Sequence, residues 1–405
     1  MKNEKLKVES EKFMERNFDY KELSNINNAK TEESYVNPHI STRKISVRQV
    51  MILFFFASVS GITRIVSPES GKILSKASWL SPFIAILPVL LLIAVLNRII
   101  VRYPEKSLSQ IIETIFGDII GKIILLLFFI HTLFFIAVFA RNFGEKFISS
   151  IFPNVAPSFF VIILLMFAVF AVRRNIESFA RFAEFSFILI CAGFIIAFII
   201  AVFHINPKNL YPVTYYDAVP ILKSSVPLIS LWSLLTFSLF LGDNMRYAGN
   251  ASENSKSVKT ATKFMLIIAL FNFLATMLVI GIFNAETVSN MSMPYFMVFK
   301  SIKTTGLIQS FETFFIIFWA FTDFIMISYY MFILSKIFKS LFAVEKPRLF
   351  MPVMGFVIFM LIFIIGENNF EVEYFYTNIL SYSSVILGFI FPFILLAVGK
   401  IRRLI

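Results

Sequence analysis

A few residues that could do chemistry stand inside long apolar stretches of this sequence. Asp323 lies near the middle of FWAFTDFIMISYY, where an ionisable side chain is costly and therefore marks a candidate functional group. The alternative is an inert carboxyl, kept neutral or bonded to a hydroxyl such as that of Thr322 or to a neighbouring helix. His131, central in another apolar stretch, is a weaker candidate, because a packed and hydrogen-bonded imidazole explains it better.

Small polar residues interrupt the first apolar stretch. Only fifteen uncharged residues separate Arg48 from Arg64, and they include the segment SVSGIT at positions 58–63. Serine hydroxyls and a glycine allow a helix to open there, and exposed backbone at membrane depth persists only beside a cavity or inside protein. The alternative is that small residues let two helices pack closely. The candidate residues are Ser58, Ser60, Gly61, Ile62 and Thr63.

A second polar run lies in the sixth apolar stretch. Pro227 removes one helical hydrogen bond, and Trp232 stands among regularly spaced hydroxyl residues. These hydroxyl residues are Ser224, Ser225, Ser230, Ser233, Thr236 and Ser238. Interrupted helices at corresponding places in two halves of five are typical of an inverted-repeat transporter with a site at the membrane midplane. Together the two runs favour a functional site over simple helix packing.

Glu177, Arg181 and Glu184 have the spacing i, i+4 and i+7, which places them on one face of a helix. Because the local charge is compensated, we interpret them as an internal ion pair that anchors the cytoplasmic end of the fifth span. No motif in the sequence predicts catalysis, since there is no Gly-rich phosphate loop and no nucleophile–base pair on a soluble domain. The sequence predicts neither an enzyme nor a cofactor.

The composition excludes a soluble protein. Of the 405 residues, 58% are hydrophobic and 15% are charged, against about 45–50% and 25% in soluble domains. The mean hydropathy is +0.80, and 52 residues are Phe. The single cysteine excludes an intramolecular disulfide, and three scattered histidines form no metal-binding pattern. We therefore predict a polytopic membrane protein of the all-α class.

Ten apolar stretches approach the length of about 20 residues that a membrane-spanning helix needs. They are Ile45–Val66, Ala77–Ile100, Ile119–Ala140, Pro157–Val172, Phe182–His204, Ile221–Gly242, Phe264–Phe283, Glu312–Phe338, Phe350–Gly366 and Tyr374–Val398. Residues 1–44 alternate charges and have few apolar residues, which predicts a disordered cytoplasmic tail. Residues 45–405 form the predicted transmembrane domain, with repeats at about 45–204 and 221–398.

Basic residues are unequally divided between the two sets of loop ends, which places both termini in the cytoplasm. The poorer, external set is Arg64, Lys72, Lys76, Arg141, Lys146, Lys208, Lys223, Lys300 and Lys303. The net charge of +12 is therefore topogenic, and no nucleic-acid partner is predicted. Two connections also look helical: Ser107–Lys122, as an interfacial helix running into the third span, and Pro294–Lys303 on the outer side.

Several phrases of the sequence resemble the B-subunit family of spore germinant receptors, a branch of the amino-acid–polyamine–cation transporter superfamily. The resemblance runs from about Ile45 to Arg403. Its phrases are ISVRQ at 45–49, WLS at 79–81, RYPEKSLSQIIETIFGDIIGK at 102–122, NIESFARFAE at 175–184, and MPYFMVFKSI at 293–302 followed by Glu312 and Trp319. One departure is LWSLL at 231–235, where relatives often carry a Phe-Pro-Phe-Gly-Glu-like stretch.

The resemblance implies the five-plus-five fold, with the first and sixth helices broken around a small-molecule pocket. The carboxylate of an amino-acid germinant would meet open backbone N–H groups near Ser60, Gly61, Ile62 and Thr63. The pocket walls would come from Ser230, Trp232, Ser233, His131, Phe134, Thr322 and Asp323. No metal ligand is implied.

By the same resemblance, the chain would be the ligand-sensing subunit of a receptor in the spore inner membrane. Its partners would be the lipid bilayer, a membrane A subunit with cytoplasmic domains, and a C-subunit lipoprotein. An alternative is a proton- or sodium-coupled amino-acid permease, in which Asp323 and His131 serve coupling. A third hypothesis is a membrane scaffold whose polar residues only pack helices.

Overall fold

The computed structural model describes residues 44–65, 74–150, 154–246, 251–291, 294–301, 311–366 and 368–404. The predicted tail lies outside these residues except for Lys44. The predicted repeat boundaries stay predictions.

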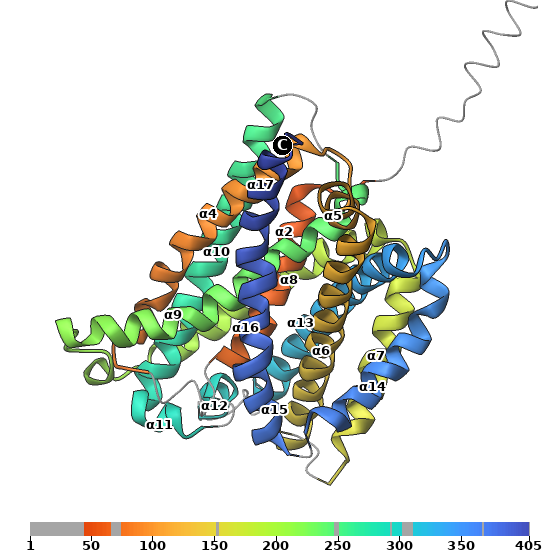
Figure 1. Cartoon of the computed structure of the whole chain (residues 1–405). Helices are drawn as coiled ribbons and strands as arrows, with labels where there is room; N and C mark the ends of the chain where they lie inside the picture. The colour runs from red at the N-terminus through yellow and green to blue at the C-terminus, as the bar shows by residue number, and fades with distance from the viewer. Residues whose placement is uncertain are drawn as a thin grey trace, which may run out of the picture. The chain divides into compact units, whose positions relative to one another are not determined.

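The described chain is built from helices (Figure 1). Within it, eight helices are long and apolar enough to cross a membrane, and two shorter apolar helices, Val47–Ile62 and Pro157–Arg173, make up the predicted ten. The first five spans are α2 (Val47–Ile65), η1 with α4 (Ser78–Leu80, Ser81–Arg102), α6 (Asp118–Ser150), α7 (Pro157–Arg173) and α8 (Ile176–Val202). The next four are α9 with η4 (Ala218–Ser233, Leu234–Asn244), α10 (Ala251–Phe283), α13 (Phe311–Phe342) and α14 (Met351–Ile365). The prediction of a polytopic helical membrane protein is confirmed.

The tenth span changes helical geometry along its length. It comprises α15 (Asn369–Phe375), η6 (Tyr376–Leu380), α16 (Ser381–Ser384), η7 (Val385–Ile390) and α17 (Phe391–Ile401), and both η6 and η7 are π-helical. A π-helical turn leaves backbone carbonyls displaced from the regular ladder, where a neighbouring helix can bond them. The sequence did not predict this.

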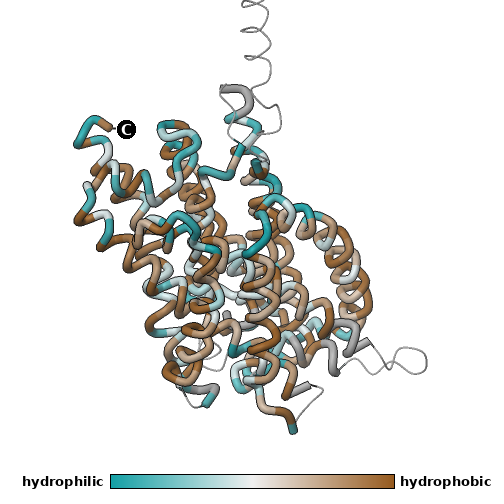
Figure 2. Tube along the Cα trace, turned by 90° about the vertical axis from the view of Figure 1, so that its right-hand side faces the viewer, coloured by the Kyte–Doolittle hydropathy of each residue, from teal (hydrophilic) through white to brown (hydrophobic). Residues whose placement is uncertain are grey.

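Apolar residues cover the lengths of the helices, and hydrophilic residues gather toward the end that carries the C-terminus (Figure 2). Phe185, Ile188 and Ile364 are each more than 70% exposed. Large apolar side chains pointing outward along whole helices suit contact with lipid rather than water.

The helix α2 lies inside the bundle. Every side chain from Val50 to Ile62 is buried, and α2 packs against α8, α9, α10 and α13. A helix that is apolar on all sides is enclosed in this way. Its few hydroxyl groups must therefore find partners on neighbouring helices.

The predicted interruption of the first span is wrong, because α2 is one continuous α-helix through positions 58–63. A side chain added at Gly61 would place Cβ 2.5 Å from a methyl of Leu231, so the glycine serves close packing, which was the alternative hypothesis. In the sixth span α9 continues through Pro227, and the change comes at Leu234, where the 3₁₀-helical η4 begins.

The connection after α4 folds as a separate helix, α5 (Leu108–Phe116), closed at its start by a reciprocal capping box between Ser107 and Gln110. It does not run into the third span as predicted, because Gly117 adopts φ 82° and ends it before α6 begins. The helix predicted in the connection from Pro294 is present as α12 (Pro294–Ser301), and its place on the outer side stays a prediction.

Both ends of the described chain lie at the connection between α4 and α5. Lys44 pairs with Glu105 at 2.5 Å, and Arg102 donates to the carbonyl of Leu404 at 2.8 Å. An even number of spans returns the chain to its starting side, as this arrangement requires. The assignment of that side to the cytoplasm stays a prediction from the charge distribution.

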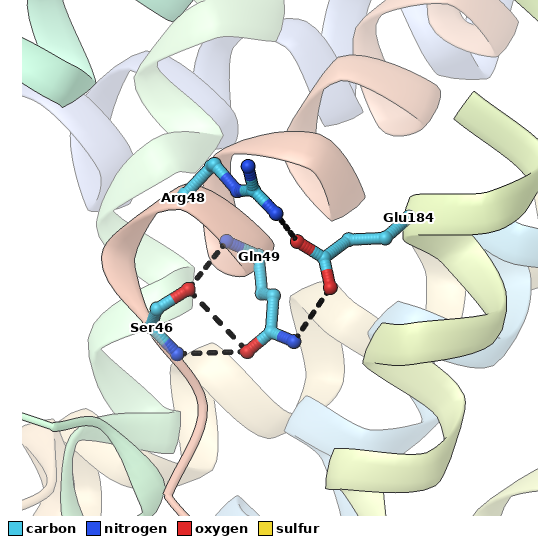
Figure 3. Close-up of polar contacts among 4 residues, drawn as sticks. All are labelled: Ser46, Arg48, Gln49 and Glu184. Carbon is cyan, nitrogen blue, oxygen red and sulfur yellow. Dashed lines mark hydrogen bonds and ion pairs between the residues drawn. The ribbon is translucent and has the colours of Figure 1, made fainter. Parts of the chain in front are cut away.

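A polar junction at this end joins α2 to α8 (Figure 3). Ser46 and Gln49 form a capping box, with bonds of 3.2 and 2.9 Å, at the start of α2. The same Gln49 amide donates to one oxygen of Glu184 at 2.8 Å, and Arg48 pairs with the other. The prediction that Glu184 belongs to an ion pair within its own helix is therefore wrong: its partners come from another span.

We expect the hydrogen bond from Gln49 to Glu184 to contribute more to stability than the ion pair of Arg48 with Glu184. Glu184→Ala should lower the unfolding free energy by about 1.5–3 kcal/mol, because it removes a carboxylate that two donors share. Arg48→Ala should lower it by less than about 1 kcal/mol, because that side chain is 65% exposed. Denaturant titration of both variants in detergent micelles would measure the difference. Equal losses would contradict this ranking.

Candidate functional site

A buried ion pair joins α6 to α13 within the bundle. The ammonium of Lys146 lies 2.8 and 3.2 Å from the two carboxylate oxygens of Asp323. The side chains of Lys146 and Asp323 are 11% and 2% exposed. Removing two charges from water costs several kcal/mol per ion, which their attraction offsets only with good geometry and further hydrogen bonds.

Further groups complete this centre. Ser60 of α2 donates its hydroxyl to Asp323, so the carboxylate accepts from two different helices. The Lys146 ammonium also lies 5.2 Å from the centre of the Trp319 ring, within the range of a cation–π contact. We call Ser60, Lys146, Trp319 and Asp323 the ion-pair centre. It links α2, α6 and α13.

Local helix geometry brings two members of the ion-pair centre together. Trp319 and Asp323 are four residues apart on α13 and so share one face. The hydroxyl of Thr322 bonds to the carbonyl of Trp319 at 2.8 Å. Of the partners that the alternative hypothesis offered for Asp323, the structure therefore has neighbouring helices and not Thr322.

Lys146 was missed because the third span was predicted to end at Ala140. The helix α6 instead continues to Ser150, and it holds Arg141 and Glu145 as an ion pair at 2.8 Å. The interpretation of Lys146 as an external loop-end charge is wrong. An isolated carboxylate at membrane depth needs a cation, and that requirement was the one signal in the sequence that could have pointed to a lysine.

A second cluster surrounds Ser58 on another side of α2. Its hydroxyl accepts from the indole N–H of Trp232 at 3.0 Å and from the amide of Asn272 at 3.4 Å. The Asn272 amide also donates to the carbonyl of Ile268 at 2.8 Å. Two predicted site residues, Ser58 and Trp232, are thus brought together, but as a buried link between the first and sixth spans.

A third cluster follows the seam between the sixth and tenth spans. Ser230 donates to the carbonyl of Ser381 at 2.8 Å, and Ser233 donates to that of Ser384 at 3.0 Å. Thr236 donates to the carbonyl of Gly388 at 2.5 Å. These three carbonyl groups belong to the part of the tenth span that contains the π-helical turns. The backbone hydrogen bonds of that part are irregular, and hydroxyl groups of the sixth span bond to carbonyls that remain accessible there.

His131 belongs to the same seam. Its Nδ1 lies 2.9 Å from the hydroxyl of Ser383 and its Nε2 lies 3.4 Å from that of Ser384. The imidazole is therefore packed and hydrogen-bonded, which is the interpretation that the sequence favoured. Phe134, three residues after His131 on α6, makes an aromatic contact, with its ring centre 5.2 Å from that of Phe375.

A family model described as spore germination protein matches residues 44–371. The chain belongs to the spore germination protein family. It is also similar to spore germination protein KB of Bacillus subtilis (strain 168), with 21% identity over 333 residues that cover 81% of this chain and 87% of the relative. The resemblance seen in the sequence is confirmed: this is a germinant-receptor-like membrane subunit with several spans.

In this spore germination protein the predicted site residues are divided among separate clusters. Ser60 and Asp323 meet in the ion-pair centre, while Ile62 lines an apolar groove between α8 and α10. The side chain of Thr63 lies outside the described residues. The structure contains no group of three potential metal-ligating side chains in the part of the chain that it describes.

Proposed function

We propose that this spore germination protein is the ligand-sensing membrane subunit of a germinant receptor, and that a small germinant such as an amino acid acts at the ion-pair centre. Family membership supports the role. The observation that carries the site is the buried pair of Lys146 and Asp323, to which Ser60 of a third span donates a hydrogen bond. Charges at such depth are costly and mark functional groups by default.

The centre matches the charges of an amino acid. A zwitterion can exchange into the pair, its carboxylate facing Lys146 and its ammonium facing Asp323, so that neither buried charge loses a partner. This replaces the expected capture of the carboxylate by N–H groups near Ser60, because in a continuous helix those groups bond within α2. Separating α6 from α13 around the ligand then shifts the balance between two helix arrangements.

The remaining parts of the proposal come from the family. The protein would lie in the spore inner membrane with both termini in the cytoplasm. It would pass the change in helix arrangement to a membrane A subunit and a C-subunit lipoprotein. Lys44 and Leu404 both contact the connection after α4, and this end of the bundle also carries Arg102, Arg402 and Arg403, as a cytoplasmic face should.

Dipicolinate release from spores that lack this gene tests the role, with L- and D-amino acids as a panel. We expect loss of the response to one or a few stereospecific germinants, with uptake of the same compounds by vegetative cells unchanged. Normal germination with impaired uptake would instead establish the permease. Unchanged germination and uptake, with no saturable binding of these amino acids to the purified protein, would leave the membrane scaffold as the remaining hypothesis.

A further inference from the structure

An apolar groove of about 430 Å³ lies between α8 and α10. On α8 it is lined by Cys191, Phe194, Ile195 and Phe198, whose spacing of i, i+3, i+4 and i+7 makes one stripe. A parallel stripe on α10 runs from Ile267 to Val279. The floor is formed by Phe55 and Ile62 of α2 and by Trp319 of α13, and Tyr295 and Val298 of α12 lie at one end.

This groove opens on the flank of the bundle rather than on an aqueous end. Ile195 and Leu270 at its edges are 60% and 51% exposed, whereas Phe55 on its floor is 1% exposed. The hydroxyl of Tyr295 is already bonded to Thr276 at 3.1 Å. A charged, water-soluble molecule would lose its hydration here without compensation, so the chemistry of the walls selects a hydrocarbon.

The length of the groove matches one leaflet of a bilayer. Ile267 and Val279 are twelve residues apart on a continuous helix, which corresponds to about 18 Å at ~1.5 Å per residue. Half of a hydrocarbon core of about 30 Å is about 15 Å. A single lipid chain lying parallel to α8 and α10 would therefore fit along it.

Exposed basic groups stand at the end of the groove where a headgroup would lie. His204 and Lys208, both exposed, follow the C-terminus of α8. The turn η2 (Pro207–Asn209) is held to the end of α10, because the backbone N–H of Asn206 and the side chain of Asn209 both donate to the carbonyl of Gly281 at 2.9 Å. Gly281 is two residues beyond Val279, the last α10 residue of the groove.

We infer that this groove binds one acyl chain of an anionic phospholipid, with the phosphate beside Lys208. Hydrocarbon walls, one leaflet of length and a cation at the headgroup level together match that ligand. The bound chain would touch Trp319, whose ring also contacts the Lys146 ammonium. The inference does not depend on the proposed germinant site.

Native mass spectrometry of the full chain in mild detergent tests the site, with dioleoyl phosphatidylglycerol and dioleoyl phosphatidylcholine as probes. We expect one retained phosphatidylglycerol with at least fivefold preference over phosphatidylcholine. Lys208→Gln should remove the preference, and Glu286→Gln, which removes an exposed negative charge from the nearby α11 (Ala285–Ser289), should not lower it. Equal retention of both lipids by the unmodified chain would overturn the anionic-lipid site.

A groove-filling variant tests where the chain lies. Ala275→Phe, inside the groove, should lower phosphatidylglycerol retention at least fivefold, while Ile196→Phe on the exposed face of α8 should not. If Ala275→Phe fails to fold, phosphatidylglycerol with brominated chains gives a second test on the unmodified chain. Bromine should quench tryptophan fluorescence, and Trp319→Phe should remove most of that quenching although Trp79 and Trp232 remain. Unchanged quenching in Trp319→Phe would overturn the location.

Discussion

Asp323→Asn is expected to abolish the germinant response and to lower the unfolding free energy by about 3–5 kcal/mol. The change leaves the Lys146 ammonium buried beside a neutral amide, and breaking one side of a buried pair costs more than the pair itself contributes. Dipicolinate release from spores and denaturant titration of the purified protein measure the two effects.

The pair of Asp243 on η4 and Lys336 on α13 provides a control that shares α13 with the ion-pair centre. These side chains also lie close, at 2.5 Å, but are 33% and 24% exposed, against 2% and 11% for Asp323 and Lys146. Asp243→Asn should therefore cost less than about 1 kcal/mol. A cost for Asp243→Asn as large as that for Asp323→Asn would contradict the role of burial.

A double variant separates stability from response. Replacing both charges by apolar residues of similar size, as in Lys146→Met with Asp323→Leu, should restore most of the stability, because apolar pairs often equal buried ion pairs in folding free energy. It should not restore the response, since nothing would remain to bind the charges of an amino acid. A responsive double variant would refute the proposed site.

Gly388→Ala is expected to lower the unfolding free energy by about 1–3 kcal/mol. A Cβ at this position would lie 2.6 Å from the hydroxyl oxygen of Ser233 and 2.7 Å from its backbone carbonyl oxygen. The backbone cannot rotate away, so the tenth span must move from the sixth and loosen the bond of 2.5 Å that Thr236 donates to Gly388.

Gly61→Ala is the control for this effect. Its Cβ would approach equally closely, 2.5 and 2.8 Å, but the contacted atoms are the two methyl groups of Leu231, which can rotate aside. We expect a smaller loss of unfolding free energy than for Gly388→Ala in the same titration, because a flexible side chain and not a backbone carbonyl must move. If both alanine variants lower the unfolding free energy by the same amount, the rigidity of the contacted atom does not determine the loss.

The sequence alone determined that this chain forms membrane-spanning helices. Uninterrupted apolar stretches long enough to span hydrocarbon have one stable solution, a helix, because the backbone must satisfy its own hydrogen bonds there. It also singled out Asp323 and Ser60, since polar groups are rare in such surroundings. The sequence also predicted the start of a helix at Ser107, because the capping box there depends on residues only three positions apart.

Only the tertiary structure decided what those polar groups contact. Lys146 lies 177 residues before Asp323 in the chain, and Glu184 lies 136 residues after Arg48, so no local pattern pairs them. For the same reason Gly61 indicated an open helix in the sequence but serves close packing against Leu231 in the fold. Helix formation depends on near neighbours, whereas the partner of a buried charge depends on which helices pack together.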